Sequence, residues 1–465
     1  MDLKGKKALV VGAGKSGQAV ARFLAGKGCR TVLTDTGGKD KFGTLLDSLA
    51  AGGVDLALGG YPGVRGAGFD MLVMSPGVPL GIPPVAEARE EGIPVTGELE
   101  LAYRFARSPI IAITGTNGKT TTTTLVGDIF REAGRRALVA GNIGVPLVDR
   151  VESYGPQDVI VAEVSSFQLE TVDQFRPRVG LILNLTPDHL DRHGDMAGYA
   201  AAKGKISMNQ QKDDFLILNY DDPLTREMKG TGDGEVIYFS RRHILEEGVF
   251  VHNNIITTRR AGEEKAVLEA GKLLIPGAHN LENALAATAA GLVMGVPEKI
   301  MAGVLAGFAG VAHRLETVAE IAGVKYVNDS KGTNPDASMK AVEAFPGPLV
   351  LIAGGRNKGN DFSEFTRLAA PKTRAMVILG ECSGEMAEAA ERAGIKKILR
   401  AESFREAVLL ARWFARKGDV VLLSPACASW DMFKSYEERG DMFKQIVREL
   451  ASSSRQPSAV SSQEE

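Results

Sequence analysis

A glycine-rich loop that contains a lysine and a threonine is the segment most suggestive of chemistry. It reads Gly-Thr-Asn-Gly-Lys-Thr over residues 115–120 and follows the apolar run Ile110–Thr114, which we expect to be a strand. Such a loop directs backbone N–H groups and a helix N-terminus at phosphate oxygens. We expect Lys119 to reach the β and γ phosphates of ATP and Thr120 to bind Mg²⁺. Because Ile113 stands where the general pattern has its first glycine, a glycine turn with a solvated lysine remains the alternative.

A carboxylate at the end of a later strand could complete a metal site. The apolar run Val159–Val161 leads to Glu163. A strand of a doubly wound sheet delivers its last residues to the ligand crevice, so Glu163 is a candidate Mg²⁺ ligand. The alternative is a carboxylate that accepts hydrogen bonds from a helix N-terminus.

Histidine and lysine side chains follow the next expected strand, Val179–Leu183. Two of the six histidines, His189 and His193, lie in the segment after it. A loop histidine is more often structural than a ligand, so His189 is only a candidate on this evidence. Lys203 lies in an alanine-rich helical pattern, where nothing in the residues distinguishes it from Lys205.

A second glycine pattern lies near the N-terminus. Gly12-Ala-Gly-Lys-Ser-Gly17 follows an expected strand and opens a helix, and Asp35 ends the next strand 18 residues after Gly17. This pattern is the fingerprint of a nicotinamide-dinucleotide site. The same loop geometry binds the pyrophosphate of any nucleotide, so a nucleotide-linked substrate is an equal alternative. The turn Ser75–Val78 follows apolar Met71–Met74 and could line the same crevice.

Three polar loops follow expected strands in the C-terminal third. They are Asn328–Pro335, Gly354–Asp361 and Ser424–Asp431, and His313–Glu316 precedes the first of these strands. Their lysine and hydroxyl groups suit an acidic small molecule. Ordinary loop chemistry is the alternative for each loop taken singly.

Short β-branched runs alternate with helical patterns along the whole chain, which predicts an α/β protein with parallel sheets flanked by helices. A length of 465 residues exceeds what one ordinary core accommodates. We expect domain borders near Arg107–Pro109 and Gly310–Arg314. Residues 240–272 read as short strands and turns without a chemical motif, and the polar tail from Ser452 reads as disordered.

Composition excludes several classes of function. A net charge of -2 provides no general field for nucleic acid or an anionic membrane. Cys29, Cys382 and Cys427 lie far apart in the sequence, which argues against a disulfide framework or a thiolate metal site and fits a reducing cytoplasm. No apolar run approaches the roughly 20 residues that span a bilayer, and the N-terminus lacks a signal-peptide core.

Taken together, these motifs resemble those of the Mur ligase family, whose phosphate loop reads G-T-N-G-K-[ST] and does not require a glycine at Ile113. The resemblance extends to about residue 450 and is faintest over 240–272. Asn328–Asn334 and Leu423–Asp431 are similar to the member that adds D-glutamate. The D-N-P-R motif of the diaminopimelate-adding member is absent from the sequence.

The resemblance implies three domains and a tail. They are a UDP-binding Rossmann-like domain over 1–108, a central P-loop ATPase domain with a mainly parallel sheet over 109–312, a Rossmann-like amino-acid-binding domain over 313–450 and a disordered tail over 451–465. It implies ATP-dependent ligation of D-glutamate to UDP-N-acetylmuramoyl-L-alanine through an acyl phosphate, in cytoplasmic synthesis of the peptidoglycan precursor. We expect a monomer that uses ATP and two Mg²⁺ ions, without nucleic acid and without membrane insertion.

The resemblance also assigns roles to individual residues. The expected ATP-binding residues are Gly115, Thr116, Asn117, Gly118, Lys119, Thr120, Thr121, Asn280, Asn283, Arg314 and Asp329. Those for the UDP substrate are Gly14, Lys15, Ser16, Gly17, Asp35, Thr36, Gly77, Asn142 and Gln168. Those for D-glutamate are Lys331, Thr333, Lys358, Ser429, Trp430 and Tyr436.

Three residues are implied to take part directly in catalysis, namely Lys119, His189 and Lys203. Thr120 and Glu163 would hold one Mg²⁺, and His189 with Lys203 the second. The family lysine that matches Lys203 is carbamoylated, which replaces its positive charge with a carboxylate.

Three other functions remain open on the sequence. A related ligase, such as folylpolyglutamate synthase or a sibling enzyme, would use another acceptor. An NAD-dependent oxidoreductase would use the N-terminal fingerprint. A non-catalytic nucleotide sensor would bind ATP and a UDP-sugar without releasing phosphate.

Overall fold

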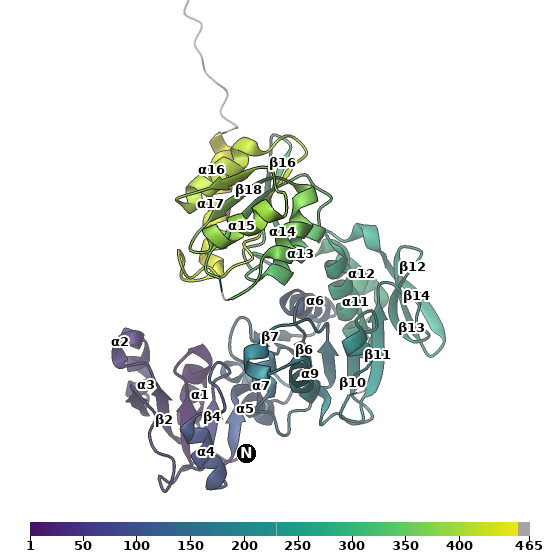
Figure 1. Ribbon diagram of the computed structural model, residues 1–465. Coiled ribbons are helices and arrows are strands. Elements are labelled where there is room, and N and C mark those ends of the chain that lie inside the picture. The colour runs from purple at the N-terminus through teal and green to yellow at the C-terminus, as the bar shows by residue number, and fades with distance from the viewer. Residues whose placement is uncertain (229, 358, 454–465) are drawn as a thin grey trace, which may run out of the picture. The chain divides into compact units, whose positions relative to one another are not determined.

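The computed structural model describes residues 1–228, 230–357 and 359–453, which form three sheets flanked by helices (Figure 1). The expected α/β class with mainly parallel sheets is confirmed. The chain forms two compact units: residues 1–272 with 282–306, and residues 273–281 with the described chain from Gly307 onward. The first unit contains two sheets and the second unit contains one.

The N-terminal sheet has five parallel strands in the order β3-β2-β1-β4-β5. Its strands are β1 (Lys7–Val11), β2 (Arg30–Asp35), β3 (Val54–Leu58), β4 (Met71–Met74) and β5 (Val95–Gly97). The helices of this part are α1 (Lys15–Gly26), α2 (Lys39–Phe42), α3 (Asp47–Ala51), α4 (Pro83–Glu90) and α5 (Glu98–Phe105), with the 3-10 turn η1 (Gly43–Leu46). The strand order reverses between β1 and β4, where doubly wound sheets bind ligands.

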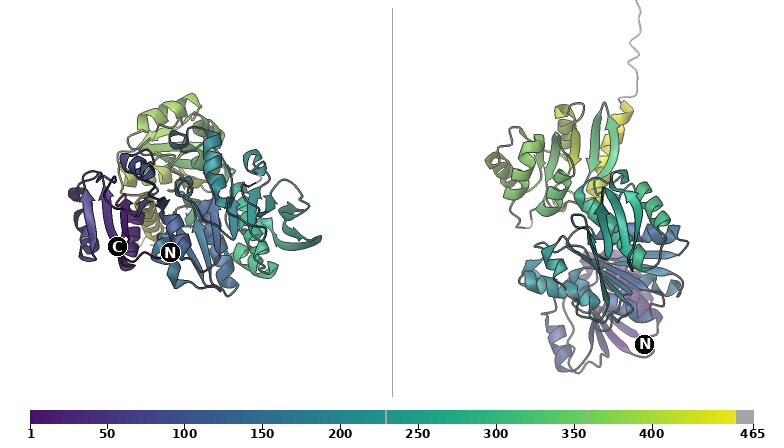
Figure 2. Two further views of the ribbon diagram at one scale, coloured as in Figure 1. Left: turned by 90° about the horizontal axis from the view of Figure 1, so that it is seen from below. Right: turned by 90° about the vertical axis from the view of Figure 1, so that its right-hand side faces the viewer.

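The central sheet has nine strands in the order β14-β13-β12-β11-β10-β9-β6-β8-β7. They are β6 (Ile110–Thr114), β7 (Ala137–Gly141), β8 (Val159–Glu163), β9 (Val179–Ile182), β10 (Phe215–Asn219), β11 (Glu235–Ser240), β12 (Gly248–His252), β13 (Ile255–Arg260) and β14 (Glu263–Glu269). Strand β12 pairs with β11 in parallel, and β13 and β14 extend the sheet further with antiparallel pairs (Figure 2). They account for the short strands expected over 240–272.

Helices and 3-10 turns connect the strands of the central sheet. They are α6 (Lys119–Glu132), η2 (Leu147–Asp149), η3 (Val151–Ser153), α7 (Ser166–Leu169), α8 (Leu190–His193), α9 (Met196–Gly204), η4 (Lys205–Ser207), α10 (Pro223–Arg226), η5 (Ala270–Lys272), α11 (Ala278–Val293) and α12 (Glu298–Gly307). Helix α11 contributes its first turn to the second unit and the rest to the first.

The C-terminal sheet has six strands in the order β15-β16-β20-β17-β18-β19. They are β15 (Glu316–Ile321), β16 (Val324–Asn328), β17 (Leu349–Gly354), β18 (Thr373–Leu379), β19 (Ile398–Arg400) and β20 (Val420–Leu423). Helices α13 (Pro335–Glu343), α14 (Ser363–Ala369) and α15 (Ser383–Arg392) pack on one face, and α16 (Phe404–Phe414) and α17 (Tyr436–Ser453) on the other. The turn η6 (Ala370–Lys372) leads into β18.

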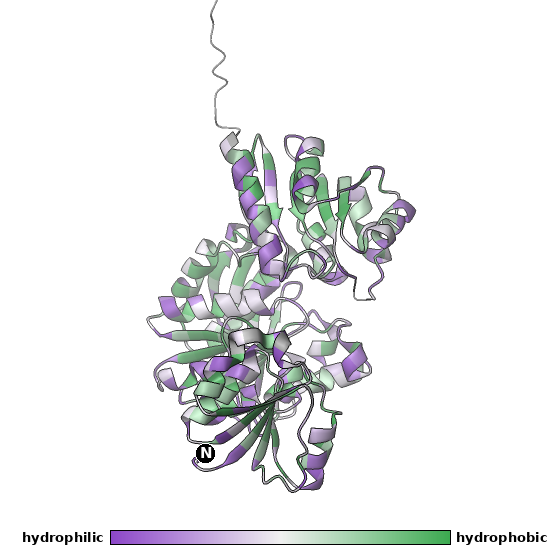
Figure 3. Cartoon of the chain, turned by 90° about the vertical axis from the view of Figure 1, so that its left-hand side faces the viewer, coloured by the Kyte–Doolittle hydropathy of each residue, from purple (hydrophilic) through white to green (hydrophobic). Residues whose placement is uncertain are grey.

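The central strands are buried on both faces, which explains why they read as continuous apolar runs. All residues of β6, β8 and β9 are buried. Figure 3 shows hydrophobic residues concentrated in the strands of each sheet. These three strands therefore provide a rigid support, and their carboxyl ends carry the polar residues singled out in the sequence.

The first two sheets share one unit because α5 packs between them. Glu100, at 0% exposure in α5, accepts hydrogen bonds from the backbone N–H groups of Asp173, Gln174 and Phe175. The expected border near residue 108 falls between α5 and β6, and the domain limits stay a prediction.

Helix α17 continues through Ser453, beyond the point where the tail was expected to begin, because Leu450 and Ala451 still pack against the sheet. The rest of the expected tail, 454–465, lies outside the described residues. Within the described part of the chain, no helix combines the length and the apolar character needed to cross a membrane.

A buried ion pair ties β18 to the loop before β20. Asp419, with a side chain only 2% exposed, accepts hydrogen bonds from Arg374 Nε at 2.6 Å and Nη2 at 3.0 Å. Burial alone would raise the pKa of Asp419, but Arg374 and the backbone N–H of Arg416 hold it below its ordinary value. This carboxylate therefore stabilises the fold above its unfolded pKa, and the contribution disappears as the pH falls through its folded pKa.

We predict that Asp419→Asn lowers the free energy of unfolding by roughly 1–3 kcal/mol at pH 7, because Arg374 loses its charged partner. Thermal unfolding followed by circular dichroism measures the effect. The difference from wild type should shrink below about pH 4. Asp128→Asn, which alters an exposed pair with Arg131, is the control and should change little. An equal loss of unfolding free energy in both variants would contradict a special role for the buried pair.

Candidate functional site

The phosphate loop lies between the carboxyl end of β6 and the N-terminus of α6, as the sequence indicated. Gly115 and Gly118 have φ of 146° and 83°, which favour glycine. A Cβ atom on Gly118 would lie 2.2 Å from Asn283 Oδ1, so the loop also needs glycine there for space. Lys119 Nζ donates to the carbonyls of Gly115 and Thr116, both at 2.8 Å, which holds the ammonium group over the loop.

Asn184, which the sequence did not single out, fixes this loop to the exit of β9. Its Oδ1 accepts from the backbone N–H of Asn117 at 2.8 Å, and its Nδ2 donates to the Asn117 carbonyl at 3.1 Å. The backbone N–H of Thr116 donates to the Asn184 carbonyl at 3.0 Å. Asn117 was expected to bind ATP, but Asn184 already engages its backbone N–H.

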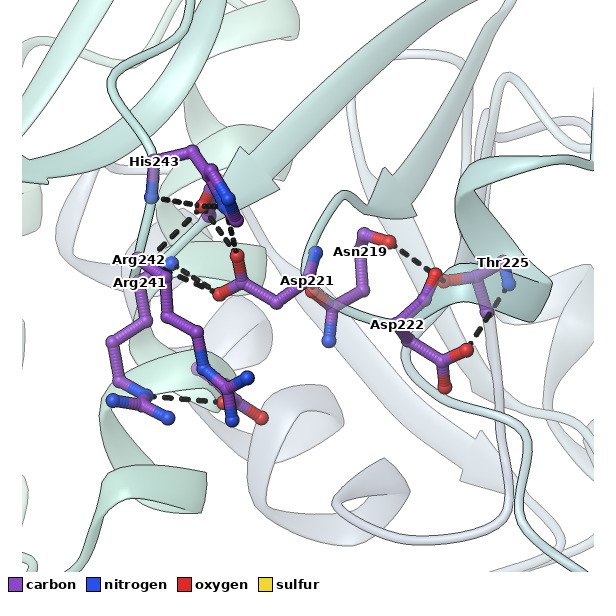
Figure 4. A network of polar contacts seen from close by, with 9 residues as sticks. Asn219, Asp221, Asp222, Thr225, Arg241, Arg242 and His243 are labelled. Atoms are coloured by element: carbon purple, nitrogen blue, oxygen red, sulfur yellow. Dashed lines mark hydrogen bonds and ion pairs between the residues drawn. The ribbon is translucent and has the colours of Figure 1, made fainter.

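The end of β10 and the loop after it, whose Asn219, Asp221 and Asp222 are labelled in Figure 4, support the exit of β9 in turn. Asn219 Nδ2 donates to the Leu183 carbonyl at 3.0 Å, and Asp222 accepts the backbone N–H of Leu185 at 2.8 Å. Asp221 accepts from Ser240 Oγ at 2.6 Å. These contacts connect three successive strands of the sheet to the phosphate loop.

The histidine in this network, His243, lies 2.9 Å from Asp221 through Nδ1. Because Ser240 donates directly to Asp221, the histidine does not stand between them as it does in a hydrolase triad. We therefore interpret the network as structural.

Thr120, in the first turn of α6, and Glu163, at the end of β8, are brought together. Thr120 Oγ1 donates to Glu163 Oε2 at 2.8 Å, and Asn142 Nδ2 donates to Glu163 Oε1 at 2.9 Å. Glu163 is 2% exposed. A hydroxyl and a carboxylate are the hard oxygen ligands that Mg²⁺ prefers, so this pair fits such an ion.

Lys203 differs sharply from an ordinary helix lysine. It is 1% exposed, and its Nζ donates to Thr114 Oγ1 at 3.2 Å and to the Gly115 carbonyl at 3.0 Å. Burial, followed by repulsion from Lys119, holds the pKa of Lys203 well below its usual range. Lys205, by contrast, donates to the Glu170 carbonyl in a half-buried position.

His189 lies at the start of α8 in a left-handed conformation, with φ of 53°. Its ring is about half exposed and packs edge-on against Phe167. Helices α8 and α9 pack together, so His189 and Lys203 come from neighbouring elements. Among the described residues, no group of three or more histidine, cysteine or acidic side chains could hold a metal ion.

The N-terminal glycine loop is closely packed at the switch point of the first sheet. A Cβ atom on Gly17 would lie 1.8 Å from the Gly12 carbonyl oxygen, so the helix start requires glycine. Ser75 Oγ donates to the same carbonyl at 2.9 Å. Gly14 and Lys15 are exposed, Ser16 is half-buried, and Lys15 Nζ donates to the carbonyl of Gly144 in the central part of the unit.

Asp35 supports this loop from the end of β2. It accepts the backbone N–H groups of Ala13 at 2.9 Å and Gly37 at 2.8 Å. Burial acts to raise its pKa, but these hydrogen bonds and Lys41 hold the pKa below the ordinary value. Thr36 beside it is exposed.

A cleft of about 660 Å³ lies between the turn after β4 and helices α7 and α8. Its lining residues are Gly77, Pro79, Leu80, Gly81, Phe167, Glu170, Asp191 and Arg192. Arg192 spans it by donating to the carbonyls of Pro76 at 3.3 Å and Val78 at 3.2 Å, and to Glu170. The sequence did not single out this arginine, which ties the first sheet to the helix that His189 begins.

Gln168 lies beside this cleft in α7. It forms a capping box with Ser165 and also contacts Glu98. Burial raises the pKa of Glu98 to about 7. Gly77 lines this cleft and Gln168 adjoins it, and the expected roles of both residues stay predictions.

Two asparagines of α11 have separate surroundings. Asn283 belongs to the first unit and accepts a hydrogen bond from Thr122 at 3.3 Å, beside the phosphate loop. Asn280 belongs to the second unit and donates to the Pro276 carbonyl at 2.6 Å. Thr121 is buried at the start of α6.

The second unit gathers its candidate residues at the carboxyl end of its sheet. Asp329 accepts from Ser424 Oγ at 2.8 Å and from the backbone N–H of Leu315, and burial raises its pKa to about 7. Arg314 is half-buried on the preceding segment and acts to lower that pKa.

The residues expected to receive D-glutamate are only partly brought into contact. Lys331 Nζ is 2.9 Å from Tyr436 Oη. Thr333 is half-buried, Ser429 is buried and Trp430 is 59% exposed. Lys358 lies outside the described residues.

Arg439 is a further residue that sequence reasoning missed. It is 1% exposed, and its guanidinium donates to Ser330 Oγ, the Ser330 carbonyl and the Cys427 carbonyl. It thereby connects α17 to the loops after β16 and β20. A lone arginine in an amphipathic helix gives no sequence signal for such a role.

Comparison with known families covers most of the chain. Residues 6–97 match the Mur ligase MurD-like N-terminal domain, residues 113–291 the Mur ligase middle domain and residues 313–427 the Mur ligase glutamate ligase domain.

Full-length relatives carry one activity in their names. The UDP-N-acetylmuramoylalanine–D-glutamate ligase of Pelotomaculum thermopropionicum is 60% identical over 97% of this chain and 99% of that protein. The protein of the same name from Alkaliphilus metalliredigens is 46% identical over 97% and 99%.

Solved structures support the fold. The UDP-N-acetylmuramate-alanine ligase MurC of Thermotoga maritima has a TM-score of 0.60 at 19% identity, covering 96% of this chain and 99% of that one. The pseudomurein peptide ligase type C of Methanothermus fervidus has a TM-score of 0.59 at 19% identity, covering 96% and 100%.

We predict that Asn184→Ala weakens ADP binding by about tenfold, or about 1.4 kcal/mol, because the loop loses two of the hydrogen bonds that hold it in place. Isothermal titration calorimetry measures the dissociation constant. Asn209→Ala is the matched control, since Asn209 also donates to two backbone carbonyls, those of Asp173 and Phe175. Equal affinities for the two variants would show that Asn184 does not position the loop.

Proposed function

The chain belongs to the Mur ligase family, and we propose that it joins D-glutamate to UDP-N-acetylmuramoyl-L-alanine with ATP in peptidoglycan precursor synthesis. The observation that carries this proposal is the 60% identity, over 97% of the chain, to a ligase named for that reaction. The match of residues 6–97 to a MurD-like N-terminal domain favours a UDP-linked substrate over a nicotinamide cofactor at the glycine loop. The products are UDP-N-acetylmuramoyl-L-alanyl-D-glutamate, ADP and phosphate.

The ATP phosphates bind in the loop before α6. Lys119 exchanges its two carbonyl partners for phosphate oxygens, and its charge offsets the negative charge that develops as the γ-phosphate is transferred. The alanine carboxylate of the substrate attacks this phosphate and forms an acyl phosphate. The amine of D-glutamate then displaces phosphate and forms the amide bond.

Thr120 and Glu163 hold one Mg²⁺ in this proposal, because their oxygens already meet at 2.8 Å beside the phosphate loop. When bound, the ion polarises the transferred phosphoryl group and neutralises its charge. Asn142 orients the Glu163 carboxylate through its hydrogen bond.

Carbamoylation of Lys203 fits the surroundings of its side chain. Burial favours the neutral amine, whose nitrogen can attack carbon dioxide and lose a proton to form a carbamate. The modification removes the repulsion between Lys203 and Lys119 and supplies a carboxylate near α8. This carbamate and His189 would hold the second Mg²⁺.

The UDP-linked substrate binds across the first unit, with its nucleotide at the glycine loop and Asp35. The cleft bounded by Gly77 and Arg192 receives the muramoyl-alanine end, beside Gln168. In the second unit, Lys331 and Ser429 offer a cation and a hydroxyl for the carboxylates of D-glutamate. We propose a cytoplasmic monomer, and sedimentation of the purified protein tests the oligomeric state.

The direct test is phosphate release from ATP and Mg²⁺ with UDP-N-acetylmuramoyl-L-alanine. D-glutamate, L-glutamate and no amino acid are compared as acceptors. Release that requires both the UDP substrate and D-glutamate is the expected result. Release with another amino acid alone would indicate a sibling ligase, and no release with any acceptor would contradict the proposal.

We predict that Lys119→Ala lowers turnover at least about a hundredfold, roughly 2.7 kcal/mol in barrier height, because the transferred phosphoryl group loses its cation. The melting temperature should stay near that of wild type, since Lys119 Nζ donates to carbonyls of its own loop, whose backbone the substitution leaves in place. Steady-state phosphate release measures the effect. Wild-type turnover in the Lys119→Ala variant would contradict a role for this loop in phosphoryl transfer.

We predict that Lys203→Ala loses most activity and regains part of it with formate or acetate, because a small carboxylate can replace the carbamate. Lys205→Ala is the matched control and should need no rescue. Mass spectrometry of the native protein under carbon dioxide should detect the added carbamate on Lys203. Full activity of unrescued Lys203→Ala would exclude this lysine from the site.

A further inference from the structure

Two of the three cysteines meet in the second unit, although 45 residues separate them in the sequence. Cys382 Sγ and Cys427 Sγ lie 3.2 Å apart. The sequence spacing argued against a pair, but the ends of β18 and β20 bring both thiols into one apolar core, at 3% and 0% exposure. Cys29 lies in the first unit, beside the hydroxyl group of Thr31, which follows it by two residues.

The two cysteines belong to loops that are already joined. The Cys382 backbone N–H donates to the Gly355 carbonyl at 3.0 Å, and the Glu381 N–H donates to Asp431 Oδ2 at 3.1 Å. The carbonyl of Cys427 accepts from the buried guanidinium of Arg439. The backbone of each cysteine is therefore held in place by hydrogen bonds to another segment of the second unit.

Cys427 directly precedes the residues expected to contact D-glutamate. Ser429 and Trp430 follow it by two and three positions. A movement of Cys427 is consequently transmitted to Ser429 and Trp430 through only a few backbone bonds.

We propose that Cys382 and Cys427 form a site of reversible oxidation, at which a peroxide joins the two sulfur atoms and ties the loop after β18 to the loop after β20. A disulfide has an S–S separation of about 2 Å, so the sulfur atoms must approach by about 1 Å. The effect of this movement on D-glutamate binding rests on the proposed function, whereas the oxidation itself does not.

The chemistry begins at Cys382, whose position favours the thiolate. The thiol of Cys427 donates toward it and lowers its pKa, and Cys382 occupies the N-cap position of α15, where its side chain makes no capping hydrogen bond. The Cys382 sulfur attacks one peroxide oxygen, which gives a sulfenic acid and one molecule of water. The Cys427 sulfur then attacks the sulfenic sulfur, and the displaced hydroxyl leaves as a second molecule of water with the thiol proton. Hydrogen peroxide is thus reduced by two electrons and the two thiols are oxidised to one disulfide.

The first test is chemical. The full-length protein is treated with hydrogen peroxide, its remaining thiols are alkylated after denaturation, and its peptides are mapped by mass spectrometry. We expect a peptide pair linked through Cys382 and Cys427, lost on treatment with dithiothreitol, with Cys29 alkylated. Three alkylated cysteines, or higher oxides of Cys382 or Cys427 without the linked pair, would overturn the proposal.

The second test measures the KM for D-glutamate before and after oxidation. A several-fold rise that dithiothreitol reverses is expected for wild type and for the control Cys29→Ser, but not for Cys382→Ala. Reversal by dithiothreitol separates this effect from methionine oxidation, which dithiothreitol does not repair under these conditions. Formation of the disulfide without a change in KM would contradict the proposed effect on the loop after β20.

The two tests also separate this inference from the proposed function. A linked peptide pair in a protein that shows no ligase activity would contradict the ligase alone. Ligase activity without the linked pair would contradict the oxidation site alone.

Discussion

The attachment of the phosphate loop to the neighbouring strand ends is the constraint on which the first unit depends. Asn184 holds Thr116 and Asn117, and Asn219 and Asp222 hold the segment to which Asn184 belongs. The backbone of the loop is therefore fixed before a ligand arrives, so little free energy is spent on ordering it. Buried strands on both sides of β6 prevent the loop from relaxing.

Charge follows from this geometry. Lys119 and Lys203 both point their ammonium groups toward the Gly115 carbonyl, while Glu163 lies at the next strand end. Two ammonium groups near one carbonyl repel each other, so one of the two lysines is expected to be neutral or modified. Lys203 is the more buried of the two, and its burial favours the neutral amine. The same few strands thus position a cation that can bind phosphate, Lys119, and an amine that can be modified, Lys203.

Much of this arrangement could be predicted from the sequence because it depends on local patterns. The strand limits of β4 and β6 agree with the apolar runs, and the glycine loops lie where strands end. The family is confirmed by the comparisons, and the residue roles stay predictions.

What could not be predicted depends on contacts between distant segments. Nothing near Lys203 in the sequence indicates that α9 packs it under β6, and Arg192 and Arg439 acquire their roles from carbonyls more than a hundred residues away or on other elements. The two cysteines meet for the same reason, through the parallel order of β18 and β20 around β17.

The glycines at the two nucleotide loops limit how these surfaces can change. Gly17 has no room for a Cβ atom, which would lie 1.8 Å from the Gly12 carbonyl oxygen, and Gly118 has a φ of 83° that other residues rarely adopt. An inhibitor that recognises the backbone at these two positions would therefore be hard to escape by substitution, because replacing either glycine would distort the loop itself. The chain could escape such a compound only by altering residues farther away.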